Sequence, residues 1–234
     1  MNKIVHINKL LLKKFGAPFR SADLPKPIDM LIATILSQNT NDQNSFKAYQ
    51  NLKSRFPSWE EVNKARRTSI EKQIKIAGLG FQKSTAIKNL LSQLKSTTGK
   101  LDLSKITPMN DKESIEYLTD FKGIGVKTAS CVLLFSLDKN ICPVDTHLHR
   151  TLNRIGLVKT KTPDKTFFAI NKDFPPKTAH SFHTNLIRLG REICKPKGYT
   201  CSICPVEKIC EFNEKNFGKA PKTTSKAFML LDNI

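Results

Sequence analysis

The sequence lacks any apolar run of about 18 residues, so we expect no membrane-spanning helix. It also lacks a secretory signal, because the opening MNKIVHINKLLLKKFG holds only three consecutive leucines between lysines. We therefore expect an intracellular protein, in the cytoplasm or nucleoid if the source is prokaryotic. Thiols stay reduced in such a compartment.

Acidic residues are scarce, since 20 Asp and Glu stand against 39 Lys and Arg and leave a net charge of +19. A basic excess of this size attracts a polyanion, and nucleic acid is the first candidate because phosphates draw such a surface from a distance. A basic surface kept only for solubility is the competing interpretation.

Strand-like alternation is also scarce, and its best candidate, 140–145, is short. Helical periodicity runs through the chain instead, for example at Leu31, Ile32, Ile35 and Leu36. The fold class is therefore predicted to be all-α. Helix starts are predicted at Ser58 with Glu61, Thr68 with Glu71, Asp111, Asp145 and Thr162-Pro163, and helix ends at Gly78, before 96–99 and at Gly156, with a last long helix over 178–191.

The segment Gly123-Ile124-Gly125 lies between two predicted helices. Glycine tolerates positive φ, which we expect at Gly125, and lets another molecule approach the backbone, so this hairpin can aim free amides at a phosphate. Ile124 is expected to anchor the turn in the core. An ordinary turn between helices is the alternative, and the neighbouring Lys122 and Lys127 favour phosphate binding.

Lys127 falls in the first turn of the second helix, where the helix dipole disfavours an ammonium and would lower its pKa. An amine with a lowered pKa is available as a nucleophile, although a phosphate-binding lysine fits the same position. Asp145 can cap a helix. It can equally stabilise positive charge on a sugar or handle a proton.

Four of the six cysteines lie within 17 residues. This crowding favours a metal centre over disulfides. Spacing alone leaves zinc and iron–sulfur both open, and Cys131 and Cys142 are expected to be small core residues. The four candidate ligands are Cys194, Cys201, Cys204 and Cys210.

Three motifs in this order resemble the helix–hairpin–helix glycosylase superfamily in its endonuclease III branch, over about residues 28–211. They are the hairpin Gly123 to Ala129, the Val144-Asp145-Thr146-His147 run, and the cysteine loop. The resemblance implies a [4Fe–4S] cluster on the four cysteines. It implies a six-helix domain over 28–133, a cluster domain from 1–27 with 134–212, and a DNA-binding cleft between them. Residues 213–234 are expected to form a basic, flexible tail.

The resemblance also implies roles. Lys127 would attack C1′ of a damaged nucleotide and form a Schiff base, after which β-elimination cleaves the strand. Asp145 would assist loss of the base, which is flipped out of the stack. The implied substrate is double-stranded DNA with damaged bases or abasic sites, bound by a monomer. The implied DNA-contact residues are Lys122, Gly123, Ile124, Gly125, the wedge Leu79, Gln38 or Asn39 as the filler of the vacated gap, His147, Lys195 and Lys197.

Two other functions stay open at the sequence level. A monofunctional relative would remove mispaired, uracil or alkylated bases, and the legible motifs do not reveal the base pocket. A non-catalytic DNA-binding protein would use the hairpin and the basic surface alone.

Overall fold

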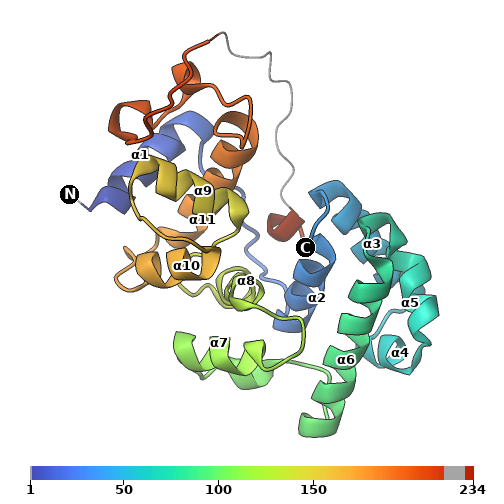
Figure 1. Ribbon diagram of the computed structural model, residues 1–234. Helices are drawn as coiled ribbons and strands as arrows, with labels where there is room; N and C mark the ends of the chain where they lie inside the picture. The colour runs from blue at the N-terminus through green and yellow to red at the C-terminus, as the bar shows by residue number, and fades with distance from the viewer. Residues whose placement is uncertain (1, 219–229) are drawn as a thin grey trace. The chain divides into compact units, whose positions relative to one another are not determined.

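The computed structural model describes residues 2–218 and 230–234, and in these ranges the chain forms helices and no strand (Figure 1). The all-α prediction is therefore confirmed, and the strand candidate at 140–145 is wrong. None of the helices in the described ranges has the length and apolarity needed to cross a bilayer.

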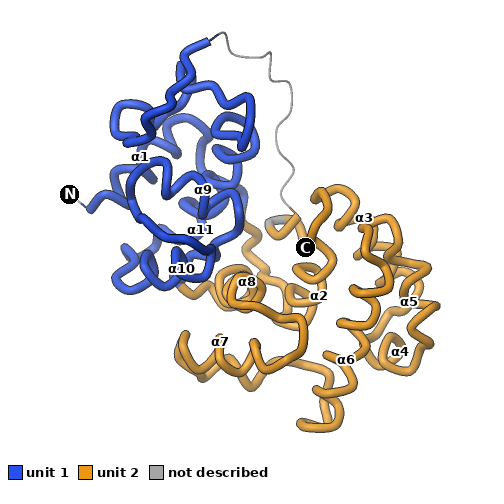
Figure 2. Tube along the Cα trace, viewed as in Figure 1, with its two compact units in different colours: residues 1–19, 140–227 blue, residues 20–139, 228–234 orange. Residues whose placement is uncertain are grey.

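The chain divides into two compact units, and each is described by itself (Figure 2). Unit 1 comprises Met1–Phe19 and Asn140–Ala227, and unit 2 comprises Arg20–Lys139 and Phe228–Ile234. The domain boundaries expected from the sequence, at 28 and 133, stay a prediction. Unit 1 contains α1 (Lys3–Phe15), α9 (Thr146–Ile155), α10 (Pro163–Asn171) and α11 (Ala179–Arg188).

Unit 2 is built around two apolar helices. Its helices are α2 (Pro27–Ser37), α3 (Asp42–Arg55), α4 (Trp59–Lys64), α5 (Arg67–Ile74), α6 (Gly80–Thr98), α7 (Asp111–Thr119) and α8 (Val126–Leu137). Most residues of α2 and α8 are buried, and the two helices pack against each other. A helix that is apolar on all sides needs neighbours around it, and α7 also packs on α8 while α3 and α6 pack on α2. This packing fixes the start of α8, where the hairpin lies.

Several predicted helix ends are confirmed. Ser58 caps α4, Asp145 caps α9 and Thr162 caps α10, each through its side-chain oxygen. Gly156 ends α9 with a left-handed conformation, and Gly78 follows the short 3₁₀ helix η1 (Lys75–Ala77) that extends α5.

Other predicted ends are wrong by a few residues. The capping residue of α7 is Asn110, which forms a capping box with Glu113, and Asp111 is the first helical residue. Thr68 lies inside α5 instead of capping it. Helix α6 continues to Thr98. The last long helix is split, because α11 passes into the π-helix η3 (Leu189–Ile193).

The core of unit 1 is formed by α1, α9 and α11. Helix α1 presents Ile4, Ile7, Asn8 and Leu11 at helical spacing as one buried face. It packs on α11, where the Asn8 amide donates to the Ser181 hydroxyl over 3.0 Å. Helix α11 packs in turn on α9, so these contacts fix the helix that Asp145 begins.

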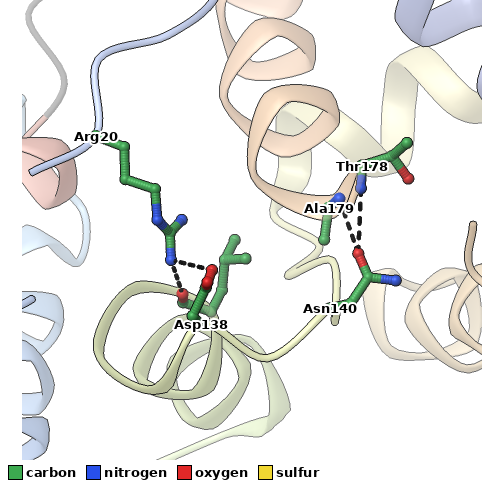
Figure 3. A network of polar contacts seen from close by, with 6 residues as sticks. Arg20, Asp138, Asn140, Thr178 and Ala179 are labelled. Atoms are coloured by element: carbon green, nitrogen blue, oxygen red, sulfur yellow. Dashed lines mark hydrogen bonds and ion pairs between the residues drawn. The ribbon is translucent and has the colours of Figure 1, made fainter. Parts of the chain in front are cut away.

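Within residues 2–218, the chain passes between the units at residues 19–20 and 139–140, and polar contacts fix it beside these two points (Figure 3). Within unit 2, Arg20 donates to the Leu134 carbonyl over 2.9 Å and to Asp138 over 2.7 Å at the end of α8. Within unit 1, the Asn140 side-chain oxygen accepts from the amides of Thr178 and Ala179 at the start of α11. Arg20 thus ties the chain to the end of α8 in unit 2, and Asn140 ties it to the start of α11 in unit 1.

The expected tail, 213–234, falls partly on residues 219–229, which lie outside the described residues. Beyond that gap, the 3₁₀ turn η6 (Leu230–Asp232) packs against α2 and α3. Leu230 is buried and its amide donates to the Asp42 carboxylate over 3.4 Å. The flexibility of the tail stays a prediction, while the apolar side chain of Leu230 packs within unit 2.

Candidate functional site

The hairpin between α7 and α8 belongs to unit 2. Ile124 is buried, which confirms its predicted role as the anchor of the turn. Gly123 has φ +90, in the region that favours glycine. Gly125 has φ −100, so the positive φ expected there is wrong. A Cβ built on Gly125 would meet no atom within 4 Å, so its missing side chain leaves open space beside the backbone.

The N-terminus of α8 has no side-chain cap, because Gly125 occupies the capping position. The first-turn amides of a helix have no partner within the helix, and together with the dipole they form an anion-binding site. Lys122 is exposed before this turn, and Lys127 is the half-buried second residue of α8. The hairpin therefore presents amides and two cations, which suits a phosphate backbone.

A second turn in unit 2 carries Leu79. We call residues 77–80 the wedge turn. Leu79 has φ +50 and its side chain is 45% exposed, an unusual combination for a large apolar residue. Ile76 and Phe81 beside it are exposed as well, and the Arg67 guanidinium stacks over the Phe81 ring at 4.4 Å. Leu79 was predicted as a wedge from the sequence, whereas the exposure of its neighbours Ile76 and Phe81 was not predicted.

A third turn follows α2, and we call residues 37–40 the filler turn. Gln38 is half-buried and ends the helix, whereas Asn39 is exposed with φ +51. Only four non-glycine residues in the described ranges have positive φ, and two of them are Asn39 and Leu79. Backbone strain of this kind gathers at functional sites, so both turns merit a functional interpretation.

The structure adds Lys83, which the sequence analysis missed. Its side chain is 2% exposed, and its Nζ donates to the carbonyls of Leu36 and Ala77, each over 2.8 Å. Burial lowers the pKa of Lys83 from its ordinary 10.5 to about 8. A sequence signal existed, because Lys83 precedes Ile87, Leu90 and Leu94 at helical spacing and so shares their buried face.

Asp145 and His147 belong to unit 1, at the start of α9. The Asp145 carboxylate accepts from the Leu148 amide over 2.8 Å. His147 is half-buried against Gly190, and its ring lies 3.3 Å from the Arg150 guanidinium. Burial lowers the pKa of His147, and Arg191 and Arg150 lower it further against the opposing effect of Asp145. His147 is therefore neutral near pH 7 and packs within its own unit.

The four clustered cysteines line one small pocket in unit 1, with a volume of about 20 Å³. Burial, with a smaller contribution from the three other thiols, raises the pKa of Cys204 to about 12. None of the six cysteines, all of which lie in the described residues, forms a disulfide, and Cys131 and Cys142 are buried, as expected for core residues. The four thiols belong to Cys194, Cys201, Cys204 and Cys210.

Within residues 2–218 and 230–234, no three His, Cys, Asp or Glu side chains converge closely enough to form a recognisable metal site. The four thiols that line the pocket are the candidate ligands of a metal centre. Its donor set is thiol sulfur, which suits iron–sulfur clusters and zinc alike.

Arg154 borders this pocket. Its guanidinium lies over the rings of Tyr199 and Phe212, at 4.6 and 4.5 Å, and donates to the Lys195 carbonyl over 2.8 Å. Lys197 is exposed on the same loop, whereas Lys195 is half-buried. The predicted contact residues thus fall into two groups. Unit 2 holds the hairpin, wedge turn and filler turn, and unit 1 holds Asp145, His147 and the cysteine loop.

Comparison with known proteins agrees with these features. The family of HhH-GPD superfamily base excision DNA repair proteins matches residues 32–176. Endonuclease III of Thermotoga maritima is 32% identical over 209 residues, which cover 89% of this chain and 92% of that protein. A protein of Arabidopsis thaliana, provisionally named a DNA glycosylase, is 36% identical over 189 residues, and the match spans 64% of its length.

Solved structures show the same fold. Endonuclease III in a non-covalent complex with DNA superposes with a TM-score of 0.74 at 23% identity, over 89% of this chain and 94% of that chain. The family match covers more than half of the chain, and the endonuclease III match covers most of both proteins. The chain therefore belongs to the HhH-GPD superfamily of base excision DNA repair proteins, as a DNA glycosylase of the endonuclease III kind, for which AP lyase activity is typical.

Proposed function

We propose that this chain removes damaged bases, chiefly oxidised pyrimidines, from double-stranded DNA and then cleaves the strand through a lysine Schiff base. The observation that carries the proposal is the position of Lys127. It is the second residue of α8, directly behind a hairpin whose Gly125 leaves the helix amides uncapped. A phosphate bound by those amides would bring the sugar of the same strand near the lysine.

The chemistry follows from an amine nucleophile. The Lys127 amine attacks C1′, and the bond between C1′ and the base breaks with its electron pair going to the base, which takes up a proton. The attached amine then loses one proton, and the bond between C1′ and the ring oxygen O4′ breaks as O4′ takes up a proton, which opens the sugar to a protonated imine. Removal of a proton from C2′ then expels the 3′ phosphate, which breaks the strand. Asp145 is assigned the first step, where a carboxylate stabilises the positive charge that develops on the sugar.

A [4Fe–4S] cluster is proposed as the resident group of the four-thiol pocket, held by the four cysteines that line it. When bound, such a cluster supplies electron-transfer chemistry and cross-links its ligands. The chain's own contribution is positional, since the cluster would fix the loop that carries Lys195 and Lys197 against phosphate. These proposals together describe a monomer that acts on DNA inside the cell.

Trapping with borohydride tests the proposed lysine chemistry. Wild-type protein mixed with DNA that contains an abasic site should give a covalent adduct, and Lys127→Gln should give none while still binding an uncleavable abasic analogue. Lys112→Gln, at an exposed lysine of α7 outside the hairpin, serves as the control and should keep the adduct. A full adduct yield from Lys127→Gln would assign the nucleophile elsewhere. Base release by Lys127→Gln at the wild-type rate, without cleavage, would favour the monofunctional alternative.

A further inference from the structure

Lys83 unites two segments of unit 2 that are far apart in sequence. One acceptor of its ammonium, the Leu36 carbonyl, lies in the last turn of α2, just before the filler turn. The other, the Ala77 carbonyl, ends η1 and belongs to the first residue of the wedge turn. Both bonds are 2.8 Å long, so the two carbonyls lie within two hydrogen-bond lengths of each other.

The final carbonyls of a helix have no partner within the helix, and the helix dipole makes that end negative. Lys83 supplies donors and a positive charge to two such ends at once. Its backbone amide also donates to the Leu79 carbonyl over 3.0 Å. Lys83 therefore contacts Leu79 through its main chain, and it contacts the ends of α2 and η1 through its side chain.

A buried ammonium is costly, and at this position an apolar residue would continue the face formed by Ile87, Leu90 and Leu94. No carboxylate in the described ranges forms an ion pair with Lys83. The lowered pKa records the same cost. The ammonium joins the two turns. Their exposed residues, Asn39 and Leu79, both have strained positive φ.

We propose that Lys83 is a positioning residue that holds the wedge turn and the filler turn in one fixed spacing, so that Leu79 and the filler residue enter the DNA duplex together. This inference rests on the proposed function, because it takes both turns to insert into DNA. Leu79 must separate a base step at the same time as the filler residue occupies the vacated space. A loose spacing between the two turns would therefore weaken binding to damaged DNA. The phosphate contacts that the hairpin makes do not depend on the spacing of these two turns.

The test compares DNA affinities of the full-length protein. The discrimination ratio is the Kd for undamaged duplex divided by the Kd for the same duplex with an uncleavable abasic analogue. Lys83→Met keeps the aliphatic stem and removes the donors, and it should lower this ratio roughly tenfold. Binding to undamaged duplex, which depends on phosphate contacts, should stay within about twofold of wild type. A fluorescent purine analogue opposite the abasic site should brighten less with Lys83→Met, because it stays stacked.

Lys88→Met is the matched control. Lys88 lies on the same helix, and its ammonium also donates to a backbone carbonyl, that of Asn63, but away from both turns. Its ratio should match wild type. Lys83→Gln, which keeps uncharged N–H donors on a slightly shorter stem, should recover part of the loss, and it provides the comparison if Lys83→Met folds poorly.

Equal ratios for wild type, Lys83→Met and Lys83→Gln would overturn the inference. Leu79→Ala separates this failure from failure of the proposed function. If Leu79→Ala lowers the ratio and the Lys83 variants do not, the wedge inserts without help from Lys83 and the coupling is wrong. If Leu79→Ala also leaves the ratio unchanged, the wedge turn does not insert and the proposed role of that turn fails first.

Discussion

The guanidinium of Arg154 donates a hydrogen bond to the sulfur of Cys194 over 3.5 Å. The backbone carbonyl of Arg154 also accepts one from the Cys210 thiol over 3.2 Å. One residue of α9 thus contacts two of the four sulfurs that line the pocket. Donors to sulfur stabilise the charge of thiolate ligands and raise the potential of a cluster that they hold.

Replacement of Arg154 should therefore weaken retention of the proposed cluster. Arg154→Gln removes the guanidinium that contacts Cys194 and lies over the rings of Tyr199 and Phe212. We expect iron to be lost faster to a chelator and the reduction potential to fall by an amount on the order of tens of millivolts. Visible absorption over time and protein voltammetry measure these effects. Cys201→Ser gives the reference for full loss of colour.

Arg188→Gln is the control for that experiment. Arg188 belongs to the same unit, pairs with Glu192 over 3.2 Å and stacks on Phe15, away from the cysteines. It should retain iron as wild type does. An Arg154→Gln protein with unchanged iron retention and unchanged potential would remove the role assigned to the contact with Cys194.

The two hairpin glycines should respond differently to substitution. Gly125 has an ordinary φ and open space beside it, so Gly125→Val should keep the fold while its side chain blocks the approach of phosphate. We expect DNA affinity to fall about tenfold, as for loss of a strong phosphate contact. Gly123 has φ +90, so Gly123→Val should instead cost about 1–3 kcal/mol of unfolding free energy.

Thermal unfolding and DNA titrations over a range of salt concentrations separate these effects. Wild-type affinity should fall steeply as salt rises, and the slope should be shallower for Gly125→Val because fewer counterions are released. A Gly125→Val protein that binds DNA like wild type at every salt concentration would show that phosphate does not approach this glycine.

Short-range sequence signals predicted much of this structure. Asp145 and Thr162 were recognised as caps because a capping oxygen and the amide it accepts from are three residues apart. The same signal failed by one residue at Asp111, because the preceding Asn110 is an equally good cap and the choice depends on packing. Thr68 failed because α5 begins earlier without any side-chain cap.

Long-range relationships were not predictable in the same way. The role of Lys83 depends on bringing Leu36 and Ala77 within reach of one ammonium, and no local pattern encodes that distance. The φ of Gly125 was mistaken because glycine in sequence signals freedom, whereas only the folded hairpin decides which glycine uses it. The position of Lys127 in the first turn of α8 was predicted from its motif, since the residues that define the hairpin are adjacent in the chain.

Asp145→Asn should separate the two chemical steps. Asparagine caps helices as well as aspartate does, so the bond from the Leu148 amide and the stability of the fold should be kept. Loss of the carboxylate should slow base release by a factor on the order of a hundred. Cleavage at a preformed abasic site should slow much less, because no base has to leave.

Single-turnover rates on the two substrates measure this difference. Asp164→Asn, at an exposed carboxylate in the first turn of α10, is the control and should match wild type in both. Equal slowing of both steps by Asp145→Asn would point to a role in binding or in the lyase step instead of base loss.

Lys83 should leave a signature in the pH dependence of stability. Its pKa is lowered from 10.5 to about 8 in the folded protein. Between these values the unfolded chain holds a proton that the folded chain has released, so stability rises with pH. The unfolding free energy of wild type minus that of Lys83→Met should therefore rise by about 3 kcal/mol from pH 8 to 10.5 and stay level outside that window. Denaturant titrations measure it, and other lysines cancel in the difference. The same difference taken between wild type and Lys88→Met should show no such rise. If the difference for Lys83→Met stays level between pH 8 and 10.5, Lys83 keeps an ordinary pKa in the folded protein.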